Sequence, residues 1–168
     1  MEELPEYLTK RIVVLGCGNV LFGDDGFGPN VAEHLSRNYS LPEYALILDV
    51  GTSVRELLFT MLLSERRPEN LIIVDAVDRG RTPGEIFEIP IEDIPERKTD
   101  DFSMHQVPTS NMLKELRDLA NISVIVIACQ VLRVPEEVEP GLSDPVSEAV
   151  PKACRIIYEK YISRRDKG

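Results

Sequence analysis

The chain reads Gly16-Cys17-Gly18-Asn19-Val20-Leu21-Phe22-Gly23-Asp24-Asp25-Gly26-Phe27-Gly28 between its first predicted strand and its first predicted helix. The apolar run from Ile12 to Leu15 predicts the strand, and a helical pattern follows the segment. A glycine-rich turn of this kind usually binds phosphate through backbone N–H groups and the positive end of a helix. Here the turn contains two carboxylates, which repel a phosphate and attract a metal cation. The segment therefore favours a metal-related site over a nucleotide site.

Length and composition indicate one domain of ordinary apolar content. We predict a single domain over residues 1–168, with an N-terminal extension at 1–10 and a C-terminal tail at 164–168. The net charge of −10 disfavours binding to nucleic acid or to an anionic membrane. No apolar run approaches the roughly 20 residues of a membrane helix. The acidic N-terminus does not resemble a secretory signal. The three cysteines form no C-x-x-C pair, so we expect a reduced, cytoplasmic protein. We also expect a monomer in solution.

Strands and helices alternate along the chain. Strands are predicted over 11–16, 45–48, 71–74 and 122–128, and an edge strand bracketed by prolines over 84–90. Helices are predicted over 27–39, 53–62, 110–120 and 144–161. Because several strands are apolar throughout, both faces of the sheet should be covered. The sequence therefore predicts an α/β protein, a three-layer α/β/α sandwich with a mostly parallel sheet.

Three helix features are more specific. Ser53 and Glu56 match a capping box at the start of one helix. Asp144 is the expected N-cap of the last helix, with Pro145 at its first position. Pro151 interrupts the pattern of that helix, so we expect a kink or a break there.

Carboxylates follow three of the predicted strands. In parallel sheets ligands bind beyond the carboxyl ends of the strands, so the side chains there should converge on one crevice; the candidates are Asp24, Asp25, Asp49, Asp75 and Asp78. Simpler roles are open for several of them. Asp24 is interpreted as a helix N-cap; Asp75 either caps the next turn or belongs to a site; Asp78 is expected to be solvated.

His105 adds an imidazole to this set. It lies in a loop shortly before a predicted helix, and loops carry function more often than their composition suggests. Two carboxylates and one imidazole at an open site suit a divalent transition metal. No second histidine is near His105, which disfavours a closed structural zinc site. Cys17 is interpreted as packing beneath the glycine turn, with a nucleophilic role as the alternative.

The motifs together resemble the hydrogenase maturation endopeptidases, the C-terminal processing proteases of nickel-iron hydrogenases. The resemblance extends from about residue 11 to the last helix and depends on these motifs: Gly16-x-Gly18-Asn19-x-Leu21-x-x-Asp24-Asp25-Gly26-x-Gly28, Leu48-Asp49-x-Gly51-Thr52, Ile72-Ile73-Val74-Asp75-Ala76, His105-Gln106, and Pro140-Gly141-Leu142-Ser143 followed by Val146 and Ala149.

The resemblance implies a fold and a set of site residues. The family fold is a sandwich with a five-stranded sheet that is mostly parallel and has one antiparallel edge strand. Nickel in the substrate is bound at positions that correspond to Asp25, Asp75 and His105, of which the two aspartates are also the catalytic candidates. The first ligand is often Glu in the family. Other residues are implied to contact the substrate: Asn19, Asp49, Gly51, Thr52 and Gln106.

The function implied by the resemblance is proteolysis. The enzyme would recognise a hydrogenase large-subunit precursor that already holds nickel and would cut off its C-terminal extension, without an organic cofactor. Nickel would either polarise the scissile carbonyl or a water, or serve only for recognition. The segment Ala128-Cys129-Gln130 resembles the processing peptidases of methanogen hydrogenases that reduce a deazaflavin coenzyme.

Two other classes of protein stay open on sequence alone. A nucleotide-binding oxidoreductase would use Gly16-x-Gly18 and Asp49, although the third glycine of the dinucleotide fingerprint is missing. A non-catalytic nickel-binding adaptor or chaperone for hydrogenase assembly would need the same ligands but no scissile peptide.

Overall fold

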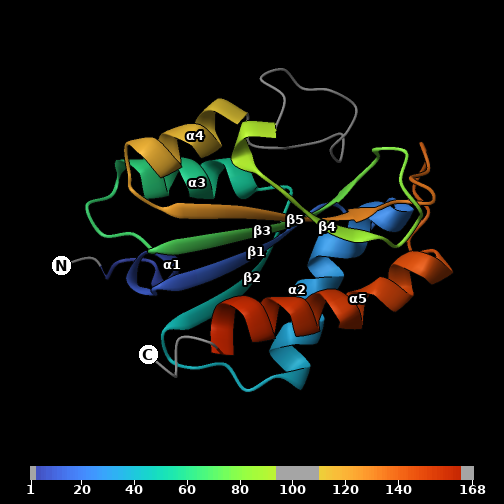
Figure 1. The fold of residues 1–168 in the computed structure, drawn as a ribbon, viewed down its shortest axis with the longest axis horizontal. Helices are drawn as coiled ribbons and strands as arrows, with labels where there is room; N and C mark the ends of the chain where they lie inside the picture. Colours follow the sequence, from blue (N-terminus) through green and yellow to red (C-terminus); the bar gives the residue numbers. More distant parts are fainter. Residues whose placement is uncertain (1–2, 94–109, 164–168) are drawn as a thin grey trace.

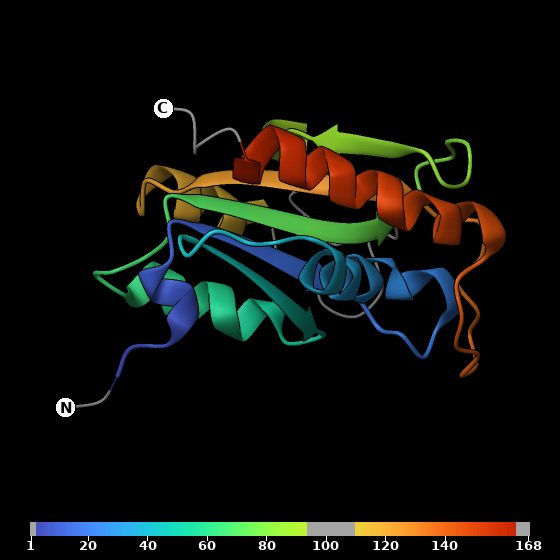
Figure 2. The same ribbon diagram turned by 90° about the horizontal axis from the view of Figure 1, so that it is seen from below.

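A five-stranded sheet forms the centre of the molecule, which a computed structural model describes over residues 3–93 and 110–163. The strand order is β2-β1-β3-β5-β4, and Figure 2 shows the strands in this order from bottom to top. The strands are β1 (Ile12–Cys17), β2 (Ala45–Gly51), β3 (Asn70–Val77), β4 (Ile86–Ile89) and β5 (Ser123–Gln130). Neighbouring strands pair in parallel except β4, which pairs antiparallel to β5 at the sheet edge. The predicted mostly parallel sheet with one antiparallel edge strand is confirmed.

Helices cover both faces of the sheet, as Figure 1 shows, with α3 and α4 on one side and α2 and α5 on the other. The helices are α1 (Glu6–Thr9), α2 (Phe27–Asn38), α3 (Val54–Leu63), α4 (Ser110–Asp118) and α5 (Asp144–Ile157); shorter turns are η1 (Gly23–Gly26), η2 (Ile91–Asp93) and the π-helical η3 (Tyr158–Ile162). None of the helices within the described residues combines the length and the apolarity needed to cross a bilayer.

Each face of the sheet has its own apolar core. Alternate residues of β1 divide between the two: Leu15 packs with α3 and α4, whereas Val14 packs with α2 and α5. Buried strands without polar alternation are the pattern expected when both faces are covered. The consequence for the site is that side chains of successive residues at a strand end point to opposite faces.

Two glycines let α2 approach the sheet closely. A Cβ on Gly28 would lie 2.2 Å from the carbonyl oxygen of Cys17 and 2.6 Å from that of Val74. A Cβ on Gly16 would lie 2.3 Å from the carbonyl oxygen of Gly28. The glycine spacing therefore serves close packing of the start of α2 against the ends of β1 and β3.

The helix features differ in detail from the predictions. Ser53 is the N-cap of α3, but its side chain makes no capping hydrogen bond, since its ψ of 16° is far from the extended conformation of a normal N-cap. The N-cap of α5 is Ser143 rather than Asp144, which is the first residue within the helix. A break at Pro151 is wrong, because α5 continues through it to Ile157.

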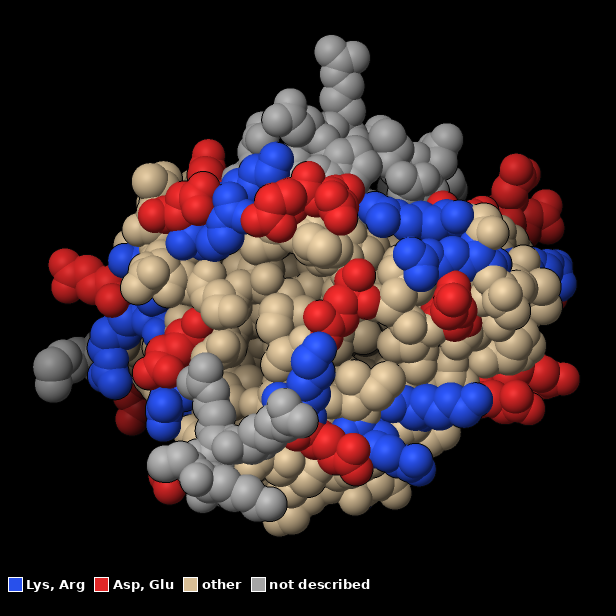
Figure 3. All heavy atoms as spheres, viewed as in Figure 1, with Lys and Arg blue, Asp and Glu red and all other residues tan. Residues whose placement is uncertain are grey.

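Charged side chains are mixed on the face of the molecule that Figure 3 shows, where Lys and Arg alternate with Asp and Glu. Ion pairs between charged side chains include Arg81 with Glu85 and Lys160 with Glu88. On this face the acidic excess is not gathered into one block.

Candidate active site

The candidate site lies where the chain changes direction across the sheet. After β1 the chain passes through α2 to β2, whereas after β3 it leads toward β4 and β5 on the other side. Such a switch point between neighbouring parallel strands is the usual ligand position in open α/β sheets. Gly16 lies opposite Val74 on one side and Asp49 on the other. The glycine turn, Asp49 and Asp75 therefore lie at the same end of the sheet, where the parallel strands have their carboxyl ends. The sequence predicted this from the carboxylates that follow the apolar runs.

Asp25 is held inside the turn that follows β1. It lies in the 3₁₀ turn η1 and is 2% exposed. Its Oδ2 atom accepts a hydrogen bond from the backbone N–H of Asn19 at 3.0 Å. Gly18, with φ of +133°, makes room for this turn, because a Cβ there would lie 2.0 Å from the carbonyl oxygen of Asp25. The turn is therefore built around the carboxylate.

Two further amides of the turn are bonded within the protein. The N–H of Gly18 donates to the carbonyl oxygen of Gly51 at 3.0 Å. The N–H of Leu21 donates to Oδ1 of Asn19 at 3.0 Å. A phosphate-binding turn needs such N–H groups for the ligand. The geometry thus argues against the dinucleotide alternative and assigns Asn19 a structural role in shaping the turn.

Asp75 lies within β3 rather than after it, so the interpretation as a turn cap is wrong. It is 3% exposed, and its Oδ1 atom accepts a hydrogen bond from the N–H of Ala76 at 2.8 Å. Ile73 and Val77, two residues to either side, both pack in the core beneath α3 and α4. By strand alternation Asp75 faces the same side of the sheet.

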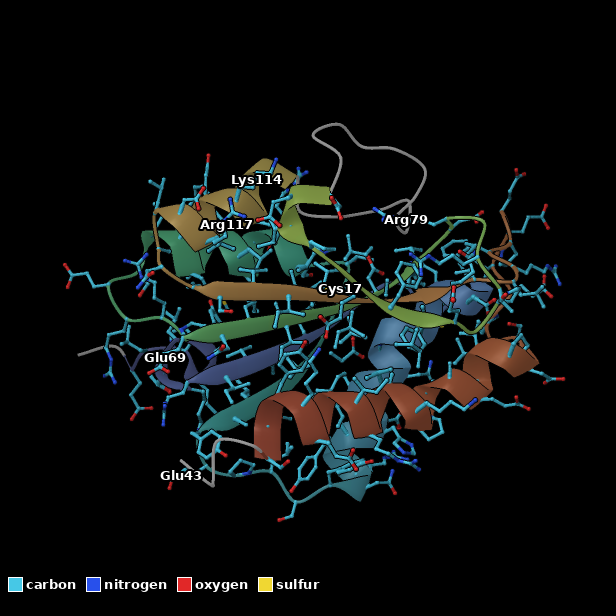
Figure 4. The ribbon with its side chains drawn as sticks, viewed as in Figure 1. Cys17, Glu43, Glu69, Arg79, Lys114 and Arg117 are labelled. Carbon is cyan, nitrogen blue, oxygen red and sulfur yellow. The ribbon has the colours of Figure 1, made fainter. Side chains whose placement is uncertain are left out.

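Cys17 is buried at the end of β1, close in sequence to the glycine turn. Its side chain belongs to the same apolar core, and Figure 4 places it among the strands, away from peripheral residues such as Glu43. Burial raises the pKa of the Cys17 thiol well above its usual value, and the charges of Asp75, Asp49 and Asp25 raise it further. The thiol is therefore protonated at neutral pH. A buried, protonated thiol is a packing group rather than a nucleophile.

The end of β2 forms one rim of the site. Asp49 is exposed, and its Oδ1 atom accepts a hydrogen bond from the N–H of Gly51 at 3.0 Å. Gly51 has a φ of +53°, a conformation that glycine adopts without strain. Thr52 follows directly and is half-buried. Asp49 lies opposite Gly16 in the sheet and Gly51 is hydrogen-bonded to Gly18, so the end of β2 lies beside the glycine turn.

The interpretation of Asp24 as a helix N-cap is wrong. Asp24 is completely buried, and the N-cap of α2 is Gly26. The carboxylate accepts hydrogen bonds from the N–H groups of Leu132, Arg133 and Ser143 and from the Ser143 hydroxyl, at 2.7 to 2.9 Å. Asp24 therefore holds the segment after β5 against the glycine turn.

Gln130 is a second organising residue that the sequence did not reveal. Its Oε1 atom accepts hydrogen bonds from the N–H groups of Arg79 and Arg81, and its Nε2 atom donates to Oδ1 of Asp78 at 3.0 Å. Asp78 itself is exposed, as predicted. Gln130 thus fixes the loop after β3, and Asp78 stands outside the buried carboxylate cluster.

His105 and Gln106 lie outside the described residues. Among residues 3–93 and 110–163, no three His, Cys, Asp or Glu side chains form a group that could hold a metal ion by themselves. The chain on both sides of the gap is described: Ile91 in η2 and Leu113 in α4 pack in the core that contains Cys17. The two aspartates are therefore described, whereas the third expected ligand is not.

Comparisons with known proteins point to one family. The sequence model of a family described as hydrogenase maturation protease matches residues 29–160. A Methanocaldococcus jannaschii protein named as a hydrogenase maturation protease is 39% identical over 150 residues, which cover 88% of this chain and 94% of the relative. The coenzyme F420 hydrogenase subunit delta of Methanothermobacter thermautotrophicus is 34% identical over 154 residues, 89% of this chain and 94% of the relative.

A solved structure leads to the same class of protein. The hydrogenase maturating endopeptidase HybD from Escherichia coli is similar with a TM-score of 0.70 at 32% identity, covering 94% of each chain. The chain therefore belongs to the hydrogenase maturation protease family. It is an endopeptidase of the hydrolase class, which confirms the resemblance seen in the motifs and makes the oxidoreductase alternative wrong.

Proposed function

We propose that this enzyme cuts the C-terminal extension from a hydrogenase large-subunit precursor that already carries nickel. The observation that supports this most directly is the pair of buried carboxylates: Asp25 lies in the turn after β1, and Asp75 lies in the neighbouring strand β3. A buried carboxylate is costly unless it is paired, hydrogen-bonded or bound to a metal. A cation brought by the substrate suits this place in charge and in ligand chemistry.

Asp25 and Asp75 are assigned to hold the nickel of the precursor, with His105 as the third ligand. Carboxylate and imidazole groups together suit divalent transition metals. Holding the metal fixes the neighbouring peptide bond relative to the enzyme, and orientation of this kind lowers the barrier substantially. Asp25 or Asp75 also serves as the general base for the attacking water. The nickel of the substrate would have one of two roles. It would act as a Lewis acid that polarises the scissile carbonyl or the water, or it would serve only for recognition of the precursor.

The rim residues are assigned to the polypeptide around the cut. Gly18 and Gly51 join the ends of β1 and β2 through one hydrogen bond. Asn19, Asp49 and Thr52 lie along the rim that this contact creates, and Gln106 follows the proposed ligand His105. These residues would contact the precursor on either side of the scissile bond.

The precursor proposed here belongs to a hydrogenase that reduces a deazaflavin coenzyme. The supporting observation is the 34% identity to the coenzyme F420 hydrogenase subunit delta, over 89% of this chain. The Ala128-Cys129-Gln130 segment adds the resemblance in sequence noted above.

Intact-mass measurement of the precursor tests the proposed function. The chain is incubated with the precursor in its nickel-loaded and nickel-free forms. The expected result is loss of the mass of the C-terminal extension from the nickel-loaded form only. Unchanged mass together with a stable complex would instead favour the adaptor, and equal cleavage of both forms would exclude nickel from recognition.

A further inference from the structure

Exposed apolar side chains gather on two loops next to the candidate site. Leu21 and Val20 belong to the glycine turn, and Leu132, Val134 and Val138 belong to the segment after β5; all five are between 38% and 64% exposed. We call these five residues the apolar loop patch. Contiguous exposed apolar surface on a monomeric domain commonly marks an interaction site.

The two loops are joined by their backbones. The N–H of Glu139 donates to the carbonyl oxygen of Leu21 at 2.8 Å, and the N–H of Gly23 donates to that of Glu139 at 2.9 Å. Phe22 and Glu139 form a parallel β-bridge. Figures 1 and 2 show the two loops side by side at one end of the molecule. The two loops that carry the patch are therefore joined to each other.

Asp24 anchors the backbone of the segment after β5 to the glycine turn. Its buried carboxylate accepts hydrogen bonds from the backbone N–H groups of Leu132 and Arg133, and the side chain of Leu132 belongs to the patch. Buried hydrogen bonds to a charged group are among the stronger ones in proteins. A surface that is already ordered loses less conformational entropy when it binds a partner.

The patch is continuous with the candidate site. Val20 follows Asn19, whose N–H donates to the carboxylate of Asp25. Leu21 donates its own N–H to the side chain of Asn19. A substrate with its metal at Asp25 would therefore extend over the patch.

Charge around the patch indicates what the partner looks like. Glu136 and Glu137 are exposed between Val134 and Val138, whereas Arg133 is paired with Glu139. An apolar centre with a charged rim is the common arrangement of protein interfaces, and the rim selects partners of opposite charge.

We infer that the apolar loop patch is the docking surface for the hydrogenase precursor, which presents an apolar stretch flanked by Lys or Arg side chains. The inference rests on the proposed function and adds to it the surface on which the precursor binds. Because docking precedes the chemical step, the patch affects the affinity for the precursor and leaves the bond-breaking step unchanged.

Steady-state cleavage of the nickel-loaded precursor tests this surface. The variants Leu132→Ser and Val138→Ser are compared with the matched control Leu119→Ser, whose side chain is also exposed but lies beyond α4, just before the start of β5. We expect KM to rise about tenfold in the two patch variants with kcat unchanged, whereas the control behaves as wild type. The double variant Glu136→Gln with Glu137→Gln should raise KM at low salt and weaken its salt dependence.

The outcomes separate the two proposals. Wild-type KM in both patch variants, with normal circular dichroism, would overturn the docking surface and leave the proposed function intact. A fall in kcat at constant KM would also overturn it, because the residues would then act on chemistry. A wild-type chain that cuts no nickel-loaded precursor would overturn the proposed function and the docking surface with it.

Discussion

Asp24 and Asp25 are neighbours in sequence, yet their carboxylates serve different parts of the molecule. Asp25 turns back to Asn19, whose backbone N–H donates to its carboxylate. Asp24 points away to the segment that follows β5. One residue is thus left to face the candidate site, as expected from the opposite directions of adjacent side chains, while the other fixes the loop that borders it.

Cys17 provides a test of the nucleophile alternative at the scale of one residue. Burial and three neighbouring aspartates raise the pKa of its thiol, so almost no thiolate exists at neutral pH. We predict that Cys17→Ala cuts the nickel-loaded precursor with a kcat within about twofold of wild type. Loss of cleavage in a folded Cys17→Ala protein would show that the thiol takes part in the reaction.

The role of a site residue could be predicted only where its neighbours in sequence indicate it. Asp25 and Asp75 could be named as candidates because Asp25 lies in the glycine-rich turn and Asp75 directly follows the apolar run 71–74. The role of Asp24 was not, because its partners Leu132 and Ser143 are more than a hundred residues away in sequence and nothing local indicates their return. Gln130 was missed as an organising residue for the same reason.

At the scale of elements, the backbone at the start of α2 packs directly against the backbones of β1 and β3, where there is no room for a side chain. A Cβ at position 28 would meet backbone atoms of Cys17 and Val74 at 2.2 to 2.6 Å, and backbone atoms cannot move aside cheaply. We predict that Gly28→Ala lowers the free energy of unfolding by about 3 kcal/mol, although Ala favours helix more than Gly does. Urea denaturation measures the effect.

The control for that variant is in the same helix. Ser36 is an exposed residue of α2, so Ser36→Ala should change the free energy of unfolding by less than about 0.5 kcal/mol. Equal urea midpoints for Gly28→Ala and wild type would contradict the close approach of α2 to β1.

The edge strand β4 is tied to the C-terminal turn by a charged contact. Lys160 Nζ lies 2.6 Å from Oε1 of Glu88, and the Tyr161 hydroxyl donates to the same oxygen. Partial burial raises the pKa of Glu88, but the hydrogen bonds from Lys160 and Tyr161 outweigh burial and the pKa is lowered. A lowered pKa in the folded state means that the contact stabilises above the unfolded pKa, and that this stability is lost as the pH falls.

The Glu88→Gln variant tests this contact. At pH 7 we predict a free energy of unfolding about 0.5 kcal/mol below wild type, the usual size for a partly exposed pair. The difference should shrink as the pH is lowered through the folded pKa of Glu88, because the wild-type carboxylate is then protonated too. A difference that is independent of pH would indicate a packing effect instead.

Element types were easier to predict than element ends. The apolar runs at 45–48 and 71–74 identified β2 and β3, but both strands continue for three residues through their aspartates. The apolar pattern underestimated the length of both strands because it ends at the first charged residue. Backbone pairing between the strands does not depend on apolar side chains and continues past the aspartates. The antiparallel direction of β4 followed from the family resemblance, since periodicity alone does not determine strand direction.

At the scale of the whole molecule, the sheet brings together segments that are distant in sequence. The switch point between β1 and β3 places Asp25 and Asp75 at the same edge. The glycine turn and the segment after β5, which Asp24 joins, lie at the same end of the sheet and expose apolar side chains there. A single end of the molecule thus contains both the candidate metal-facing carboxylates and the proposed docking surface.

The direct test of the central claim compares Asp75→Asn with Asp78→Asn in cleavage of nickel-loaded precursor, followed by intact mass. Asn keeps the size of the side chain and can still accept the hydrogen bond from Ala76, so the fold should survive. We predict that Asp75→Asn slows cleavage by roughly a thousandfold, whereas Asp78→Asn, on an exposed residue three positions further on, cuts at the wild-type rate. Wild-type cleavage by a folded Asp75→Asn protein would contradict a substrate-metal site at the carboxyl ends of β1 and β3.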